Sequence, residues 1–519
     1  MKKIFASLLA STLLLVSCTV STPTATATPP TASPLPVSPA PEVTPVVTAS
    51  GPDPLDTPWD DRSLFQSGLV ESQQAVLDEL AGASVYHIEF NIDDSIYQIS
   101  GHQDVRYTNK EDVDLNEVQF RLFPNILGGQ IDLSHVTVDG QEITPEFGLE
   151  NSLLIVRLRA ALEPGQSVEI SMDFDITVPQ SVELNYGVLA YADNVLALAH
   201  AYPMICVYDD EGWNSEIPPQ DGDVTYGETS FYIVKISAPR DLTLVASGSE
   251  IRRDEAGQTQ TVYVANGPAR DFYLVASPEY EEISKTFGEV IIRSYAPAGL
   301  ASGAEMALDV AAKAIEIFSR RYAPYPYTEF DIVSTPTLAL GIEYPGMVAI
   351  TSRIYDVSGD YRGSPTSVYM ESTVAHEVGH QWFYALVGDD QLDDPWLDES
   401  LTQFITLQYY EDEYGPQAAE SFRESLEGRW ERVGNADIPI GLPVASYDGA
   451  EYGAIVYGRG PLFFVELREE MGIEKYDAFL RDYTETLSWG IATPEFLHSL
   501  AEEHCGCELD RLFEEWVYP

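Results

Sequence analysis

The feature that most constrains this chain is the segment ValAlaHisGluValGlyHisGlnTrp at residues 374–382. Its two histidines, His376 and His380, stand four residues apart, and an α-helix brings residues at this spacing onto one face. Two imidazoles on one face can bind the same metal ion, and Glu377 would then lie beside the ion without binding it. Two surface histidines on an amphipathic helix are the alternative. Eight histidines in 519 residues make a chance match of this kind rare.

A third ligand is needed to complete the protein's share of a catalytic zinc site. Glu399, in TrpLeuAspGluSer at 396–400, follows His380 after eighteen residues, which leaves room for one helix to end and another to begin. The three residues His376, His380 and Glu399 would hold one Zn²⁺ per chain and leave a position open for water. Glu377 could deprotonate that water as it attacks a carbonyl carbon and then protonate the departing amine.

The sequence around the two histidines favours a helix with marked ends. Ser364-Pro365 has the pattern of an N-cap followed by proline at the first helical position, and Gly388 predicts the end of the helix. Apolar residues four apart continue the helical pattern at Val374, Val378, Trp382 and Leu386.

Two further segments could contribute to such a site. Glu343 is a lone carboxylate among the apolar and turn-forming residues of 340–348, and burying it would be costly unless a ligand ammonium paired with it. A solvated loop glutamate explains the same pattern equally well. Tyr452 and Tyr457 are candidate donors to a developing oxyanion, but in a chain with 30 tyrosines the residues alone do not decide between catalysis and packing.

The N-terminus predicts export and attachment. Residues 1–18 have two lysines, an apolar run too short to span a membrane, and small residues before Cys18, as in a signal peptide. The end of this segment resembles the lipobox of bacterial lipoproteins, which implies that Cys18 is lipidated and anchors the protein to a membrane. A plain cleaved secretion signal is the alternative. We therefore expect a lipid-anchored protein of the bacterial cell envelope that faces outside the cytoplasm.

Hydrophobic periodicity predicts an α+β protein with two folded domains. Residues 19–58 are rich in Pro and Thr and nearly uncharged, which predicts a disordered linker, and 59–82 predict a short helical lead-in. Residues 83–283 alternate with period two and predict a β-rich N-terminal domain, whereas helical patterns dominate 284–519. The sequence is long enough for at least two hydrophobic cores.

Charge and cysteine content exclude some classes of protein, among them nucleic-acid-binding proteins and disulfide scaffolds. With 28 Lys and Arg against 83 Asp and Glu, the net charge of −55 repels nucleic acid, so we exclude nucleic-acid binding. A solubilising exterior explains this acidity better than a preference for cationic substrates. The four cysteines are too few for a disulfide scaffold, and Cys505 and Cys507 could form only a strained bridge or half a metal site, so we interpret them as incidental.

Together these segments resemble the aminopeptidase N family of zinc metallopeptidases, the gluzincins, which include leukotriene hydrolase. The resemblance rests on the His-Glu-x-x-His motif, on Glu399, on Glu343 in Gly-x-Glu-Tyr-Pro-Gly, and on Tyr457 in Tyr-x-Arg-Gly. It covers the chain from about residue 83 to the C-terminus. It implies a β-rich saddle domain followed by a thermolysin-like, mostly helical catalytic domain.

The resemblance also implies an activity and residue roles. The family removes amino acids from the free N-termini of peptides with a zinc-activated water. Glu343 would hold the substrate's α-ammonium, Gly341 would seat the peptide through its backbone, and Tyr457, in preference to Tyr452, would stabilise the tetrahedral intermediate. His200 is the polar residue nearest to where the family's β-domain contacts the amine, although a packed or surface histidine is the favoured interpretation.

The sequence departs from the family pattern at three points. Gly341 and Glu343 are one residue closer than in the family motif, and Asp398 and Ser400 replace the usual asparagine and glycine beside the third ligand. The printed sequence ends just after the predicted catalytic domain, and we expect longer peptides to enter the site more freely than in larger relatives.

Two alternatives to an aminopeptidase are a zinc hydrolase of another bond, with epoxide or endopeptidase activity, and a non-catalytic surface protein that keeps the fold. The second is disfavoured because the predicted ligands, Glu377 and Tyr457 are all present.

Overall fold

The computed structural model of this protein describes residues 51–219 and 222–518. The predicted signal peptide, with Cys18, and most of the predicted linker lie outside the described residues. Within the described residues, none of the helices combines the length and the apolar character that a membrane crossing requires.

The predicted helical lead-in is a series of short turns rather than one helix. It consists of the 3-10 turns η2 (Ser63–Gly68) and η3 (Glu71–Gln73) and the single α-turn α1 (Val76–Glu79). Phe65 and Leu69 are fully buried and belong to the same hydrophobic core as the long helices of the C-terminal region. The lead-in therefore packs on the chain that follows it.

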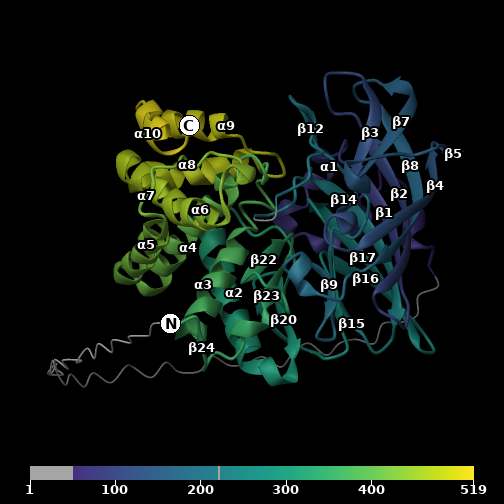
Figure 1. Cartoon of the computed structure of the whole chain (residues 1–519), viewed down its shortest axis with the longest axis horizontal. Coiled ribbons are helices and arrows are strands. Elements are labelled where there is room, and N and C mark those ends of the chain that lie inside the picture. Colours follow the sequence, from purple (N-terminus) through teal and green to yellow (C-terminus); the bar gives the residue numbers. More distant parts are fainter. Residues whose placement is uncertain (1–50, 220–221, 519) are drawn as a thin grey trace, which may run out of the picture. The chain divides into compact units, whose positions relative to one another are not determined.

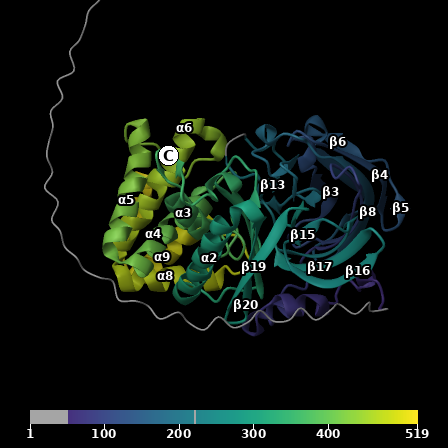
Figure 2. The ribbon, with the colours of Figure 1, turned by 90° about the horizontal axis from the view of Figure 1, so that it is seen from below.

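The N-terminal region is built from β-sheets, as the period-two pattern predicts. Its largest sheet has eight strands in the order β16-β17-β14-β1-β2-β8-β4-β5. Strand β1 pairs with β14 in parallel and with its other neighbour, β2, antiparallel. Figure 2 shows how this sheet curves from β4 and β8 round to β17 and β16. The strands of the region are β1 (Val85–Ile92), β2 (Gln98–Thr108), β3 (Leu115–Arg121), β4 (Gln130–Val138), β5 (Gln141–Glu142), β6 (Glu146–Gly148), β7 (Leu153–Leu162), β8 (Ser167–Thr177), β9 (Leu189–Ala192), β10 (Val195–Ala199), β11 (Met204–Ile205), β12 (Tyr208–Asp209), β13 (Gly212–Trp213), β14 (Ser230–Pro239), β15 (Thr243–Ala246), β16 (Ser249–Ala256), β17 (Thr259–Ala269) and β18 (Tyr273–Ser277).

Strand β8 shows why this sequence forms a sheet. Its side chains alternate between exposed and buried along the strand, with Ile170, Met172 and Phe174 turned into the core and Glu169 turned to solvent. Alternation of this kind lets one face of the sheet exclude water while the other stays polar.

A second, five-stranded sheet belongs to the C-terminal region, in the order β19-β20-β21-β23-β22. Its strands are β19 (Tyr280–Phe287), β20 (Val290–Pro297), β21 (Glu329–Thr335), β22 (Gly341–Tyr344) and β23 (Met347–Thr351). Strand β19 crosses the predicted domain boundary at 283–284, because its hairpin partner β20 pairs onward with β21 of the C-terminal region. The edge strand β22 carries both Gly341 and Glu343.

Helices form the rest of the C-terminal region (Figure 1). They are α2 (Ala301–Arg321), α3 (Thr366–Gly379), α4 (Leu401–Tyr414), α5 (Pro416–Trp430), α6 (Gly449–Ala454), α7 (Gly460–Met471), α8 (Ile473–Thr486), α9 (Pro494–Cys505) and α10 (Asp510–Trp516). Two short π-helical segments, η9 (Trp396–Ser400) and η12 (Ile455–Arg459), run directly into α4 and α7. The mixture of a β-rich and a helical region is the predicted α+β class.

Helix α3 is shorter than predicted at both ends. Ser364–Pro365 forms the short strand β25, paired with β24 (Asp360–Tyr361), and α3 begins at Thr366. Trp382 and Leu386 lie beyond the helix but are buried, so their spacing reflects burial in a tight turn and not helical continuation. Gly388 does not end the helix. A Cβ there would lie 2.2 Å from Cζ of Arg270, so the glycine makes room for that buried guanidinium.

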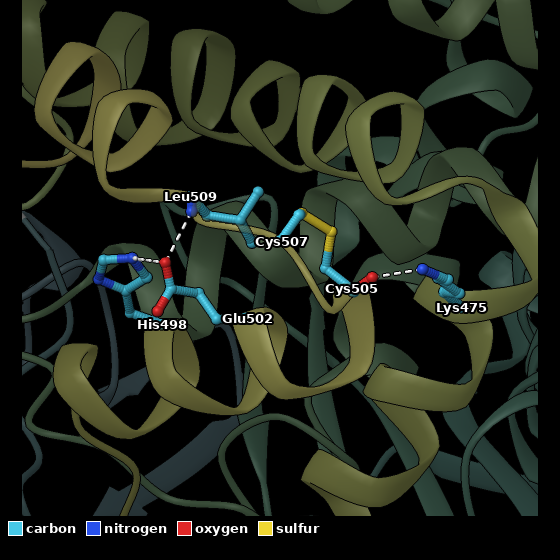
Figure 3. Close-up of a disulfide and its surroundings, with 6 residues drawn as sticks. All are labelled: Lys475, His498, Glu502, Cys505, Cys507 and Leu509. Atoms are coloured by element: carbon cyan, nitrogen blue, oxygen red, sulfur yellow. Dashed lines mark hydrogen bonds and ion pairs between the residues drawn. A yellow bond between two sulfur atoms is a disulfide. The ribbon is translucent and has the colours of Figure 1, made fainter.

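The cysteine pair interpreted as incidental forms a disulfide between Cys505 and Cys507 (Figure 3). Helix α9 ends there because Gly506 takes a left-handed conformation, with φ 65°, which turns the chain so that the two thiols meet. Next to it, Glu502 Oε1 accepts a hydrogen bond from the backbone N–H of Leu509 at 2.7 Å. The bridge therefore belongs to the turn between α9 and α10.

Candidate metal centre and its cleft

The three predicted metal ligands meet at one point. Nε2 of His376 lies 3.0 Å from Oε2 of Glu399 and 3.2 Å from Nε2 of His380, and Nε2 of His380 lies 3.5 Å from the same carboxylate oxygen. All three side chains are buried. Residues 23 positions apart in the sequence thus present three ligand atoms to a single point.

Local structure explains this convergence. His376 lies in the last turn of α3, and His380 caps the helix, its N–H donating to the carbonyl of His376. Glu399 lies in the π-helical segment η9, whose wider turn is a form of helix often found at functional sites.

Outer contacts fix the ring of His380. Its Nδ1 lies against Oδ1 of Asp398 and 3.1 Å from the carbonyl oxygen of Phe383. Gln391 in turn donates to Oδ2 of Asp398 at 2.6 Å. Holding Nδ1 against acceptors leaves Nε2 free to bind a metal, which is the usual arrangement around metal-binding histidines. Asp398, which stands where the family pattern usually has asparagine, therefore orients the predicted ligand His380.

The residues present fit a divalent cation. Two imidazole nitrogens and one carboxylate oxygen are the donor set of a catalytic zinc site. Burial, reinforced by the charge of Glu343, raises the pKa of Glu377 well above its usual range, and burial also raises the pKa of Asp398. A divalent cation at the ligand cluster would favour the ionised forms of these crowded carboxyl groups.

Glu377 lies beside the ligand His380 and close against strand β22. Its carboxylate lies beneath strand β22, where a Cβ on Gly341 would come within 2.3 Å of Oε1 of Glu377. Any side chain at Gly341 would therefore displace Glu377. The structure gives Gly341 a direct steric reason to be glycine.

Glu343 is buried, which excludes the alternative of a solvated loop glutamate. One of its oxygens accepts a hydrogen bond from Nε2 of Gln391 at 3.1 Å, and the carboxylate groups with Glu377 and His380 near the ligand cluster. Burial raises the pKa of Glu343 to about 8. Among the described residues, no Lys or Arg forms an ion pair with it, so its carboxyl group is free to pair with a ligand ammonium, which would favour the ionised form.

The two candidate tyrosines differ in position. The hydroxyl of Tyr457, in the π-helical segment η12, donates to Oε1 of Glu399, and Tyr457 lines the cleft over the ligands. The ring of Tyr452 packs edge-on against that of Tyr457 at 5.7 Å and does not line the cleft. Of the two tyrosines, Tyr457 is therefore the one that faces the ligand cluster.

His200 takes part in a buried network in the β-rich region. Its Nε2 lies 3.0 Å from Oδ2 of Asp271 and 2.9 Å from the hydroxyl of Thr225, and Tyr384 donates to the same Asp271 oxygen at 2.7 Å. This agrees with the interpretation of His200 as a packed histidine, although it borders the cleft.

A cleft of about 1070 Å³ opens over the ligand cluster. Residues of both the β-rich and the helical region line it. Sequence reasoning missed its acidic and polar residues Asp223 and Gln391 and its cationic residues Arg362, Arg429 and Arg432. These lie on loops and helix ends that carry no local motif, so only the signs of their charges could have drawn attention to them.

Comparison with known proteins finds similarity to metallopeptidases. The model of the peptidase family M1 domain matches residues 306–516. Aminopeptidase M1-B of Oryza sativa subsp. japonica is 27% identical over 294 residues, covering 54% of this chain and 33% of that protein. Aminopeptidase N of Lactobacillus delbrueckii subsp. lactis is 23% identical over 415 residues, covering 74% and 46%. The chain thus spans about a third to a half of the length of these relatives.

Solved structures share the fold over most of the chain. The M1 zinc metallopeptidase of Deinococcus radiodurans has a TM-score of 0.64 at 18% identity, covering 88% of this chain and 95% of that chain. A mutant of it bound to a Tyr-Ser-Ala substrate has a TM-score of 0.65 at 19% identity, with the same coverage. The predicted order of a β-rich and then a helical region is confirmed.

Proposed function

We propose that this chain is a member of the aminopeptidase N family, as the match of the peptidase family M1 domain to residues 306–516 supports, and that it is a zinc-dependent aminopeptidase that hydrolyses the N-terminal bond of peptides. One observation carries the proposal: the buried carboxylates of Glu343 and Glu377 lie beside His380 of the ligand cluster. An anchor for an ammonium group and a general base thus share one side of the site.

His376, His380 and Glu399 would hold the zinc ion, which would polarise the scissile carbonyl and make water acidic enough to attack at neutral pH. The carboxylate of Glu377 accepts the proton of the attacking water and passes it to the departing amide nitrogen. This carboxylate lies so close to Gly341 that a side chain there would collide with it. Glycine at position 341 therefore leaves room for the group that takes the proton.

Tyr457 supplies a donor for the oxygen of the scissile carbonyl. Its hydroxyl already lies at Glu399, at the edge of the ligand cluster, and needs only to turn from that carboxylate to the oxyanion as charge develops. A donor preplaced in a buried site stabilises the transition state more than it stabilises the substrate.

Glu343 explains why the reaction would remove one residue at a time. A carboxylate that holds the α-ammonium next to the ligand cluster fixes which carbonyl reaches the attacking water. Gln391 holds Glu343 in place for this purpose and at the same time holds Asp398, so one amide links the amine anchor to the orientation of His380.

Hydrolysis of a panel of aminoacyl p-nitroanilides with and without a chelator tests the proposal. We expect release that the chelator abolishes and added zinc restores, and no release from N-acetylated forms. Release from the N-acetylated forms would indicate an endopeptidase. Failure to cleave every member of the panel would favour a hydrolase of another bond or a non-catalytic surface protein.

We also propose that the protein is anchored to the bacterial envelope through a lipid on Cys18. The support is the sequence of residues 1–18 alone. Metabolic labelling with a radioactive fatty acid should mark the wild-type protein and leave a Cys18→Ser variant unlabelled. Equal labelling of both would contradict the anchor at this residue.

A further inference from the structure

Two neighbouring arginines form part of the cleft wall. Arg429 lies at the end of α5 and Arg432 in the following 3-10 turn η10 (Glu431–Val433), and both line the cleft. The chain has only 28 Lys and Arg against 83 Asp and Glu. Two adjacent cations in a cleft of so acidic a protein call for an explanation.

Neither arginine has an acidic partner among the residues that the structure describes. Arg423, on the same helix, shows the usual arrangement, with Glu420 at 3.3 Å and Glu427 at 3.5 Å. The third cleft arginine, Arg362, lies over the ring of Tyr361 at 5.2 Å. Arg429 and Arg432 therefore present unneutralised charge to the cleft, and each repels the other.

Packing fixes Arg429 beside the ligand cluster. Its Nη1 donates to the backbone carbonyl of Tyr457 at 3.2 Å. Helix α5 comes this close to η12 because residue 458 is glycine: a Cβ on Gly458 would lie 2.9 Å from Cβ of Arg429 and 3.0 Å from the backbone nitrogen of Trp430. The guanidinium is thus positioned by the segment that also carries Tyr457.

The cleft consequently has an acidic and a cationic side. Glu343 groups with His380, whereas Arg429 contacts Tyr457, whose ring lies 6.1 Å from that of His376. The ligand cluster lies between the two sides. A peptide whose ammonium is held at Glu343 and whose first carbonyl is at the cluster continues toward the arginines.

We propose that Arg429 and Arg432 bind the C-terminal carboxylate of short peptides, so that the enzyme prefers di- and tripeptides with a free C-terminus. Guanidinium groups bind carboxylates through paired hydrogen bonds, which gives both affinity and orientation. Arg429 contacts the backbone carbonyl of Tyr457 and Glu399 contacts its hydroxyl, so the two lie at opposite ends of one tyrosine. One peptide residue spans roughly 3.5 Å, so one or two residues beyond the cleaved bond would cover the length of that side chain. The inference rests on the proposed aminopeptidase activity.

The test compares peptides that differ only at the C-terminus. We expect kcat/KM for Ala-Ala and Ala-Ala-Ala to exceed that for their C-terminal amides by about 10- to 100-fold, mostly through KM, as for a hydrogen-bonded charge pair. The double variant Arg429→Gln/Arg432→Gln should lose this preference. The single variant Arg432→Gln changes an exposed residue and keeps the test valid if the double variant does not fold.

Arg423→Gln is the matched control, because it removes the same charge from the same helix away from the cleft, and it should keep the wild-type ratio of acid to amide. A ratio near one for the wild-type protein would overturn the inference. A preference for Ala-Asp-amide over Ala-Asn-amide without a preference for free C-termini would also overturn it. In that case the arginines would bind an acidic side chain and not the C-terminal carboxylate.

Hydrolysis of alanyl p-nitroanilide, which lacks a carboxylate, separates the two proposals. If this substrate is cleaved and the ratio is near one, only the present inference fails. If neither the anilide nor any peptide is cleaved, the proposed activity itself fails.

Discussion

The two sides of the cleft are built in different ways. On the acidic side, Glu343, Glu377 and Asp398 are buried, and Gln391 links two of them by hydrogen bonds. On the cationic side, Arg429 is half-buried, Arg432 is exposed, and no acid among the described residues pairs with them. The acidic side is thus organised in advance for chemistry, whereas the cationic side offers its charge to a ligand.

Removing the predicted general base from the acidic side should have the largest effect on activity. In Glu377→Gln, loss of the proton acceptor should reduce kcat by about 10²- to 10⁴-fold, the range for a general base. Zinc content should be unchanged, because Glu377 is not a ligand. Glu371→Gln on the same helix is the control and should retain activity. Near-normal turnover of Glu377→Gln would refute the role of this residue.

Removing the amine anchor should have the next largest effect. In Glu343→Ala, kcat/KM for alanyl p-nitroanilide should fall about 100-fold, chiefly through KM, since a buried charged partner of the ammonium is lost. The propionyl analogue, which lacks the amine, measures the background. An equal loss on both substrates would show that Glu343 does not bind the amine.

The outer contact of His380 should matter less. In Asp398→Asn, zinc affinity should fall about 10- to 100-fold, as for other partners that orient a metal-binding histidine. Competition with a zinc-binding dye measures this directly. Asp393→Asn changes an exposed acid in the turn before η9, and an equal loss of affinity in this control would point to a general charge effect instead.

The smallest effect should come from a change in the packing that positions the cationic side. In Gly458→Ala, the new methyl group would crowd α5, and the free energy of unfolding should fall by about 1–3 kcal/mol, the usual cost of overpacking. The preference for free C-termini should fall as well. Gly428→Ala has no atom within 4 Å of its new Cβ, so thermal unfolding of this variant should match or exceed that of the wild-type protein.

The sequence was sufficient for the parts of the site that follow local rules. The histidine pair could be predicted because helical spacing alone brings His376 and His380 together. Glu399 could be predicted because its spacing from His380 leaves room for one helix to end and another to begin. Residues such as Gln391, Asp223 and Arg429 could not be predicted, since they reach the cleft through tertiary packing. No pattern near them in the sequence indicates where they point.

The fold shows the same limits. Period two predicted β-structure correctly, but it does not say which sheet a strand joins, so hairpin β19–β20 crosses the expected boundary at 283–284. The predicted helix extended over Trp382 and Leu386 because buried apolar residues in a turn can have the same spacing as those on one face of a helix. The bridge between Cys505 and Cys507 depends on the left-handed conformation of Gly506, a property of the turn and not of the spacing.

Metal analysis of purified variants tests the central claim most directly, that two histidines and a distant carboxylate form one zinc site. Mass spectrometry of the metal content should find one zinc per chain in the wild-type protein and in Glu377→Gln, and little in Glu399→Ala. A wild-type protein that binds no zinc, or a Glu399→Ala variant that binds it as tightly as the wild type, would contradict the account.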